Sequence, residues 1–148
     1  LYENDSLLFD TTINSIYIET IDGIYGVKLR NALENNLINH HNLAGRGNIN
    51  YKLKVKLTST DTSMAIRSDD VATLIKSTYT AKIALREKNS GKTILQDSFS
   101  ISTSRNVLSD PYGTVTSQDA GKERSVNLLA NDIAQRIILF FKNQGREI

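Results

Sequence analysis

The sequence lacks cysteine and tryptophan altogether, and its 148 residues include only one proline, one methionine and two histidines. The absence of cysteine excludes disulfides, thiol nucleophiles, zinc fingers and cysteine-bound iron–sulfur clusters. No apolar run approaches the roughly 18 residues that a transmembrane helix requires. The hydrophobic fraction of 39% and the charged fraction of 23% are typical of one globular domain. The net charge of +2 is too small to make the whole protein a polyanion binder.

Motifs for catalysis and cofactor binding are also missing. The sequence contains no P-loop, no dinucleotide-binding glycine motif, no G-x-S-x-G nucleophile motif and no EF-hand loop. The histidines, His40 and His41, are adjacent at an expected helix end, where their side chains point about 100° apart. Asp61, Asp69 and Asp70 are expected in a solvated hairpin turn. We therefore predict no enzymatic activity, no metal site and no cofactor.

Hydrophobic periodicity predicts one α+β domain over residues 15–144, after an irregular lead-in at residues 1–14. The β-α-β start implies a parallel crossover, and the two hairpins that follow are antiparallel. Each helix has one apolar stripe, which favours two helices packed on one face of a mixed four-stranded sheet in the order β-α-β-β-β-α. The expected strands are residues 15–21, 51–57, 71–86 and 93–103, and the expected helices are residues 22 to about 39–42 and 117–142.

The segment Tyr51–Leu57 alternates apolar residues with lysines and predicts a half-buried strand with a basic outer face. Such a face could meet the phosphates of a lipid headgroup, a nucleic acid or an acidic partner, or could simply keep an exposed sheet soluble. Outward aromatic residues that would stack on bases are almost absent, which argues against nucleic acid. The basic residues expected on this face are Lys52, Lys54, Lys56, Lys76, Lys82 and Arg86.

Two loops carry more apolar residues than a solvated linker needs, at residues 59–70 and 107–113. These loops are expected either to contact a partner or to fold back over the open end of the core. The second loop is expected to lead into the last helix, with Thr116 or Ser117 as its cap. The candidate contact residues are Met64, Ile66, Leu108 and Tyr112, and Arg67 is a further phosphate candidate.

Three segments together carry a family resemblance. Residues 82–95 form a strand, a glycine-containing turn and a return strand, and residues 104–113 form a loop reading S-R-N-V-L-S-D-P-Y-G. The last helix opens D-A-x-x-x-R at Asp119 and continues L-A-x-x-I-x-x-R from Leu129. In this order and spacing, residues 15–141 resemble the LPS-assembly lipoprotein family, LptE, the plug partner of the outer-membrane LPS-translocating barrel.

The resemblance implies a fold of two helices on a four-stranded sheet and a non-enzymatic role on the periplasmic side of the outer membrane. A member of this family would plug its β-barrel partner, assist the assembly of that barrel and bind lipopolysaccharide (LPS). The lipid-bearing N-terminal cysteine of the family is absent, and we expect that the anchor was removed. A different envelope accessory lipoprotein, one that regulates a protein such as a cell-wall synthase, is the alternative. The LPS-phosphate candidates are Lys52, Lys54, Lys56, Arg67, Lys76 and Lys82, and the barrel-contact candidates are Met64, Ile66, Leu108 and Tyr112.

Overall fold

The computed structural model describes residues 12–13, 15–37, 49–65, 73–107 and 111–146. It contains a single mixed sheet in the order β1-β2-β3-β4, with β1 parallel to β2 and the other neighbours antiparallel. The predicted α+β fold and the order β-α-β-β-β-α are confirmed. The elements are β1 (Ile16–Ile18), α2 (Ile24–Leu37), β2 (Tyr51–Ala65), β3 (Thr73–Glu87), β4 (Thr93–Val107) and α3 (Pro111–Arg146).

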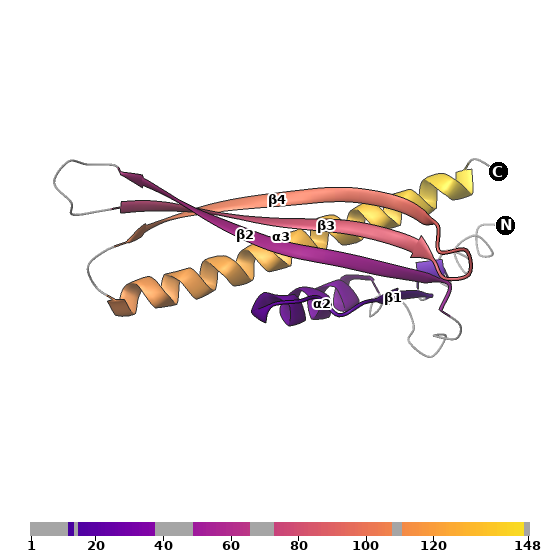
Figure 1. Ribbon diagram of the computed structural model, residues 1–148, viewed down its shortest axis with the longest axis horizontal. Helices are drawn as coiled ribbons and strands as arrows, with labels where there is room; N and C mark the ends of the chain where they lie inside the picture. Colours follow the sequence, from indigo (N-terminus) through magenta and orange to yellow (C-terminus); the bar gives the residue numbers. More distant parts are fainter. Residues whose placement is uncertain (1–11, 14, 38–48, 66–72, 108–110, 147–148) are drawn as a thin grey trace.

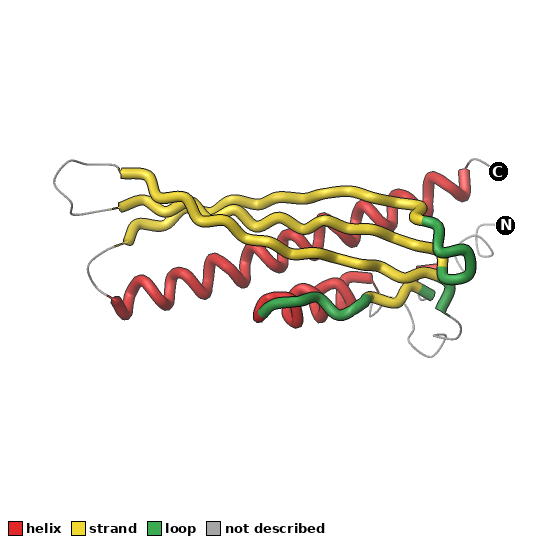
Figure 2. Tube along the Cα trace, in the orientation of Figure 1, coloured by secondary structure: helices red, strands yellow, loops and turns green. Residues whose placement is uncertain are grey.

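The two helices lie on the same face of the sheet, and α3 crosses diagonally beneath the three long strands (Figures 1 and 2). We call the other side, which no described helix covers, the open face. The core lies between the sheet and the helices, and Ile13, just before β1, is part of it. The fully buried large side chains are Ile13, Ile16, Ile18, Leu29, Leu33, Leu37, Leu53, Leu85, Leu129, Ile133 and Ile137.

The three long strands have 15 residues each, more than the sequence pattern predicts. The prediction that residues 59–65 belong to a hairpin loop is wrong, because all 15 residues of β2 are in register with β3. The alternation of apolar and polar residues stops after Leu57, and Thr58–Ser63 are polar on both faces. Pairing with β3 rather than burial keeps this segment extended, so the hydrophobic pattern does not reveal it.

The other strand boundaries differ more modestly. β1 has three residues instead of the seven expected from residues 15–21, and β4 extends four residues past the expected end at Thr103. The predicted hairpin turn between β3 and β4 is confirmed, with Gly91 at a φ of 70°. A left-handed φ of this kind is accessible to glycine at little cost.

The last helix begins earlier than predicted. Pro111 is the first residue of α3, so residues 111–116 are helical and the expected caps at Thr116 and Ser117 are wrong. Proline is favoured at the first position of a helix because its fixed φ suits the helix and its missing N–H has no partner there in any case. Glycine and β-branched residues in this turn are weak helix formers, which is why the sequence favours a loop.

The half of the sheet away from the β3–β4 turn has a polar helix-facing side. Ser77, only 1% exposed, donates a hydrogen bond of 2.6 Å from its Oγ to Asp61 Oδ1. Arg105 Nη1 donates to the same hydroxyl at 3.1 Å. Burial raises the pKa of the neighbouring Tyr79 hydroxyl. These contacts join β2, β3 and β4 where the apolar core ends.

One ion pair connects the sheet to α3. Arg136 Nε donates to Asp97 Oδ2 at 3.0 Å, while the other oxygen of Asp97 accepts the Ser98 N–H at 2.8 Å. The Ser98 N–H and the Arg136 guanidinium both stabilise the carboxylate and lower the pKa of Asp97. Because both side chains are more than one-third exposed, solvent screens the attraction. The pair therefore joins α3 to β4 but contributes little to stability.

Candidate functional site

Five basic side chains gather on the open face, and we call them the cationic patch: Lys52, Lys54, Lys56, Lys82 and Arg86. They come from two neighbouring strands, β2 and β3, and all are exposed. The pairing of β2 with β3 sets Lys52 opposite Arg86 and Lys56 opposite Lys82. Directly opposed residues of an antiparallel pair have Cβ atoms roughly 5 Å apart, so these like charges are close neighbours.

Like charges in direct opposition destabilise a sheet, and nothing among the described residues relieves them. No described ion pair involves a residue of the patch. The open-face positions from Lys52 to Thr62, from Lys76 to Arg86 and from Gln96 to Ser104 include no aspartate or glutamate. An anion placed across the two strands would reduce the mutual repulsion, so the patch favours a negatively charged ligand.

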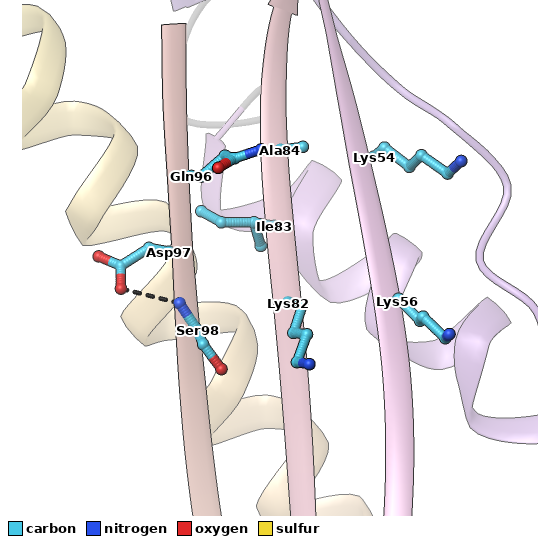
Figure 3. Close-up of a pocket in the computed structure, with 8 residues that line it drawn as sticks. All are labelled: Lys54, Lys56, Lys82, Ile83, Ala84, Gln96, Asp97 and Ser98. Carbon is cyan, nitrogen blue, oxygen red and sulfur yellow. Dashed lines mark hydrogen bonds between the residues drawn. The ribbon is translucent and has the colours of Figure 1, made fainter. Parts of the chain in front are cut away.

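An open hollow of about 500 Å³ adjoins the patch. Figure 3 shows Lys54 and Lys56 on β2, Lys82 on β3, and Gln96 and Ser98 on β4 around it. Register places Lys54, Ala84 and Gln96 in one row across the sheet, and Lys56, Lys82 and Ser98 in the next row. The small Ala84 side chain on β3 leaves space between the lysines of β2 and the neutral hydrogen-bonding groups of β4, Gln96 and Ser98.

Besides the predicted lysines, the hollow is lined by Ile83, Ala84, Gln96, Asp97 and Ser98. The Asp97 carboxylate is paired with Arg136, so Gln96 and Ser98 are the additional polar groups open to a ligand. Gln96 and Ser98 are two residues apart on β4, and this spacing places both on the same face as the lysines once β4 is aligned with β3. Their amide and hydroxyl groups can donate or accept hydrogen bonds. The site therefore combines ammonium groups, which bind phosphate, with neutral groups suited to hydroxyls.

The remaining phosphate candidates do not join the patch. Lys76 is on the open face and exposed, but it lies six residues along β3 from Lys82, a separation of roughly 20 Å. Lys76 is opposite Thr62 and Ser104, so its neighbours in the sheet are hydroxyls. Arg67 lies outside the described residues.

The two barrel-contact candidates that the structure describes, Met64 and Tyr112, lie at the end of the molecule away from the β3–β4 turn. Met64 belongs to β2 rather than to a loop, and Tyr112 belongs to the first turn of α3. Ile66 and Leu108 lie outside the described residues, as do His40 and His41. The ends of β2 and β4 and the start of α3 thus lie at one end of the molecule (Figure 1).

A second hollow, of about 400 Å³, lies between the two helices. Its lining is dominated by amides, and one apolar side chain, Leu128, is 46% exposed. None of the described helices is long and apolar enough to cross a membrane. The residues that line the hollow are Ala32, Asn35, Asn36, Arg124, Asn127, Leu128 and Asn131.

These features define a class of protein: a two-layer α+β domain with both helices on one side and a cationic sheet face on the other. The sequence model described as "LptE: Lipopolysaccharide-assembly" matches residues 13–140. The chain belongs to the LptE lipopolysaccharide-assembly family, as the sequence resemblance predicts. This is a family of non-enzymatic accessory lipoproteins that work with an outer-membrane LPS-assembly barrel.

Solved structures share the fold. A Caulobacter crescentus protein assigned as a lipoprotein superposes with a TM-score of 0.66 at 19% identity, covering 92% of this chain and 96% of the other. Rare lipoprotein B from Shewanella oneidensis superposes with a TM-score of 0.58 at 14% identity, covering 87% of this chain and 99% of the other. No curated protein gives a significant match. At these identities the structures support the fold alone.

Proposed function

We propose that this protein is the lipoprotein subunit of an LPS translocon, with its domain over residues 15–144 plugging an outer-membrane β-barrel, assisting the assembly of that barrel and binding LPS. In its native form it is held at the periplasmic side of the outer membrane by an N-terminal lipid. It acts by binding and not by catalysis. Membership of the LptE family supports the general role, and the cationic patch is the observation that carries LPS binding.

The phosphates of LPS match the patch in charge. The lipid A and inner-core regions carry phosphate groups, and ammonium and guanidinium groups bind phosphate through charge-assisted hydrogen bonds. A phosphate between Lys56 and Lys82 would contact both strands at the point where their charges oppose each other. Gln96 and Ser98 on β4 would then face the sugar hydroxyls beside that phosphate.

Reversing two charges of the patch is expected to weaken LPS binding. Lys52→Glu with Lys54→Glu should raise the dissociation constant on the order of tenfold at low salt, because each exposed charge contributes a few tenths of a kcal/mol to about 1 kcal/mol. The difference should shrink at high salt, since exposed charges are screened. Binding is measured by titration with purified LPS, and circular dichroism checks that the fold is kept.

The matched control is Arg124→Glu with Lys142→Glu, which makes the same change in net charge at exposed positions of α3. If the affinity of this control falls as far as that of the patch variant, binding depends on net charge and not on the patch. If neither variant changes LPS binding at low salt, the patch is not the LPS site.

The barrel partner has its own test. When the full-length lipoprotein is captured from solubilised native outer membranes, a large β-barrel protein should copurify with it at a fixed ratio. A reproducible absence of the barrel rules out the plug role. Recovery of a cell-wall synthase in its place supports the alternative of an accessory lipoprotein that regulates a protein partner.

A further inference from the structure

The open face changes character beyond the cationic patch. On β2 and β3 the basic residues give way to threonines after the row that holds Lys56 and Lys82, and β4 continues with serines. The three strands still run side by side there, and no described helix lies over this side of the sheet (Figures 1 and 2). We call the next two rows the hydroxyl track: Thr58, Thr80 and Ser100 in the first row and Thr60, Thr78 and Ser102 in the second.

Hydrogen bonds between neighbouring strands hold the hydroxyls of the track in place. The side-chain oxygens of Thr80 and Ser100 are 2.9 Å apart, and those of Thr78 and Ser102 are also 2.9 Å apart. A hydroxyl has one proton and two lone pairs, so each bonded pair keeps one O–H donor and further acceptor sites for a ligand. Because these side chains are already ordered, less conformational freedom is lost when a ligand binds to them.

The track has the chemistry of a carbohydrate site more than that of a protein interface. Its two rows contain only threonine and serine, with no charged group and no large apolar side chain. The buried centre of a protein interface is typically apolar, with aromatic residues and arginine enriched. Sugar hydroxyls donate and accept hydrogen bonds as serine and threonine hydroxyls do. Neutral, regularly spaced hydroxyls are therefore suited to a sugar chain.

Positive charge lies on both sides of the track. The cationic patch is on one side, and the row of Thr62, Lys76 and Ser104 follows on the other. Lys76 is exposed, and no described ion pair involves it. The distance along β3 from Lys82 to Lys76 is roughly 20 Å, enough for several sugar rings. A ligand that fits this order has phosphate at one end, then neutral sugar, then an anionic group further along the sugar chain.

We propose that the hydroxyl track and Lys76 form a glycan subsite, which holds the sugar chain of the phosphorylated glycolipid whose phosphates the cationic patch binds. The inference rests on the proposed function, because it takes the patch as the phosphate site. The sugar chain runs away from the β3–β4 turn, across the two rows of hydroxyls, and ends at Lys76. The ammonium group of Lys76 binds a carboxylate or a phosphate on the chain. Affinity then depends on the saccharide as well as on lipid A.

Two ligands with the same lipid A test the subsite. Purified lipid A and LPS that also carries the inner-core sugars are titrated side by side. The parent chain should bind the LPS about tenfold more tightly, because the sugars add several hydrogen bonds of ordinary net strength. Ser100→Ala with Ser102→Ala removes the β4 side of the track. This variant should raise the dissociation constant for the LPS by about fivefold and leave that for lipid A unchanged.

The matched control is Ser59→Ala with Ser63→Ala. It makes the same two substitutions at exposed positions of β2 that face the opposite side of the sheet. Both dissociation constants should stay those of the parent chain. Circular dichroism checks that the two variants melt within a few degrees of each other, so that a difference in binding reports on the track and not on the fold.

Lys76→Gln tests the far end of the subsite. Loss of this exposed charge should weaken binding of the LPS by about threefold at low salt and leave binding of lipid A unchanged. LPS with and without phosphate on its inner-core sugars identifies the group that Lys76 binds. A loss that persists without this phosphate assigns a sugar carboxylate, and a loss that disappears assigns the phosphate. An unchanged affinity for both forms of LPS overturns the assignment of Lys76.

Three results overturn the glycan subsite. If the parent chain binds lipid A and LPS equally, or if Ser100→Ala with Ser102→Ala weakens both equally, the track holds no sugar, while phosphate binding at the patch stands. If neither ligand binds the parent chain, the LPS-binding function fails and the subsite fails with it. If the alanine variant keeps both affinities but captures less of the barrel from native membranes, the hydroxyl track is a protein contact.

Discussion

Replacing Ile133 with aspartate is expected to unfold the domain. Ile133 is fully buried in the middle of α3, and Leu129 and Ile137 continue its stripe on the same helix face. An unpaired carboxylate at this position either stays charged in an apolar environment or takes up a proton, and both alternatives cost several kcal/mol. Because a domain of this size has about 5–15 kcal/mol of stability, the loss should be visible as a collapse of the thermal transition in circular dichroism.

Leu139→Asp is the matched control for this prediction. Leu139 belongs to the same helix but is 54% exposed, so the new carboxylate stays in water and the melting temperature should change little. If Ile133→Asp melts at the temperature of the parent chain, the stripe of α3 that faces the sheet has been wrongly assigned.

Replacing Gly26 with alanine is expected to destabilise the protein by about 2 kcal/mol, the range for overpacking a filled site. In an exposed helix the same change would stabilise by roughly 0.5–1 kcal/mol, because alanine is the better helix former. Gly26 is buried in α2, and a Cβ at this position would overlap the backbone carbonyl oxygen of Ile21 and lie 2.7 Å from its carbonyl carbon. Backbone atoms cannot rotate away, so α2 must shift. Chemical denaturation measures the change in the free energy of unfolding.

Gly121 provides the control, since it is a helical glycine with space around it. The nearest atom to a Cβ at Gly121 would be Thr103 Oγ1, at 3.9 Å, an ordinary contact distance. Gly121→Ala in α3 should therefore leave the free energy of unfolding unchanged or raise it by up to about 1 kcal/mol. An equal loss in both variants would contradict the close approach of α2 to Ile21.

The layers of this fold follow from short-range patterns in the sequence. The lysines between Tyr51 and Leu57 stand at every second position, so any strand formed there must place them on one face. The apolar stripe of α3 likewise requires one side of that helix to be covered. Two segments have no such pattern: residues 58–63 are polar on both faces, and residues 111–116 are weak helix formers. Strand pairing and a proline at the first helical position determine their structure.

One part of the candidate site follows from residue spacing within a single strand, and the other part depends on contacts between segments that are distant in the sequence. Spacing within β2 is enough to set Lys54 beside Lys52 and Lys56. It says nothing about Gln96 and Ser98, which are forty residues further along the chain and reach the hollow only through β3. Asp97 stands out in the sequence because it is a charged residue on the mainly apolar face formed by every second residue of β4. That position does not indicate its partner, Arg136 on α3.

By itself, then, the sequence determined which face of each strand and helix is apolar, because side-chain periodicity is a local property of the backbone. The order and spacing of several weak motifs in the sequence also identified the family. Only the tertiary structure decided that Lys56 opposes Lys82, that Lys52 opposes Arg86, and that Lys76 lies apart from the patch. The reason is that strand register is set by contacts between distant segments, and a shift of two residues would keep every face intact while rearranging every pair.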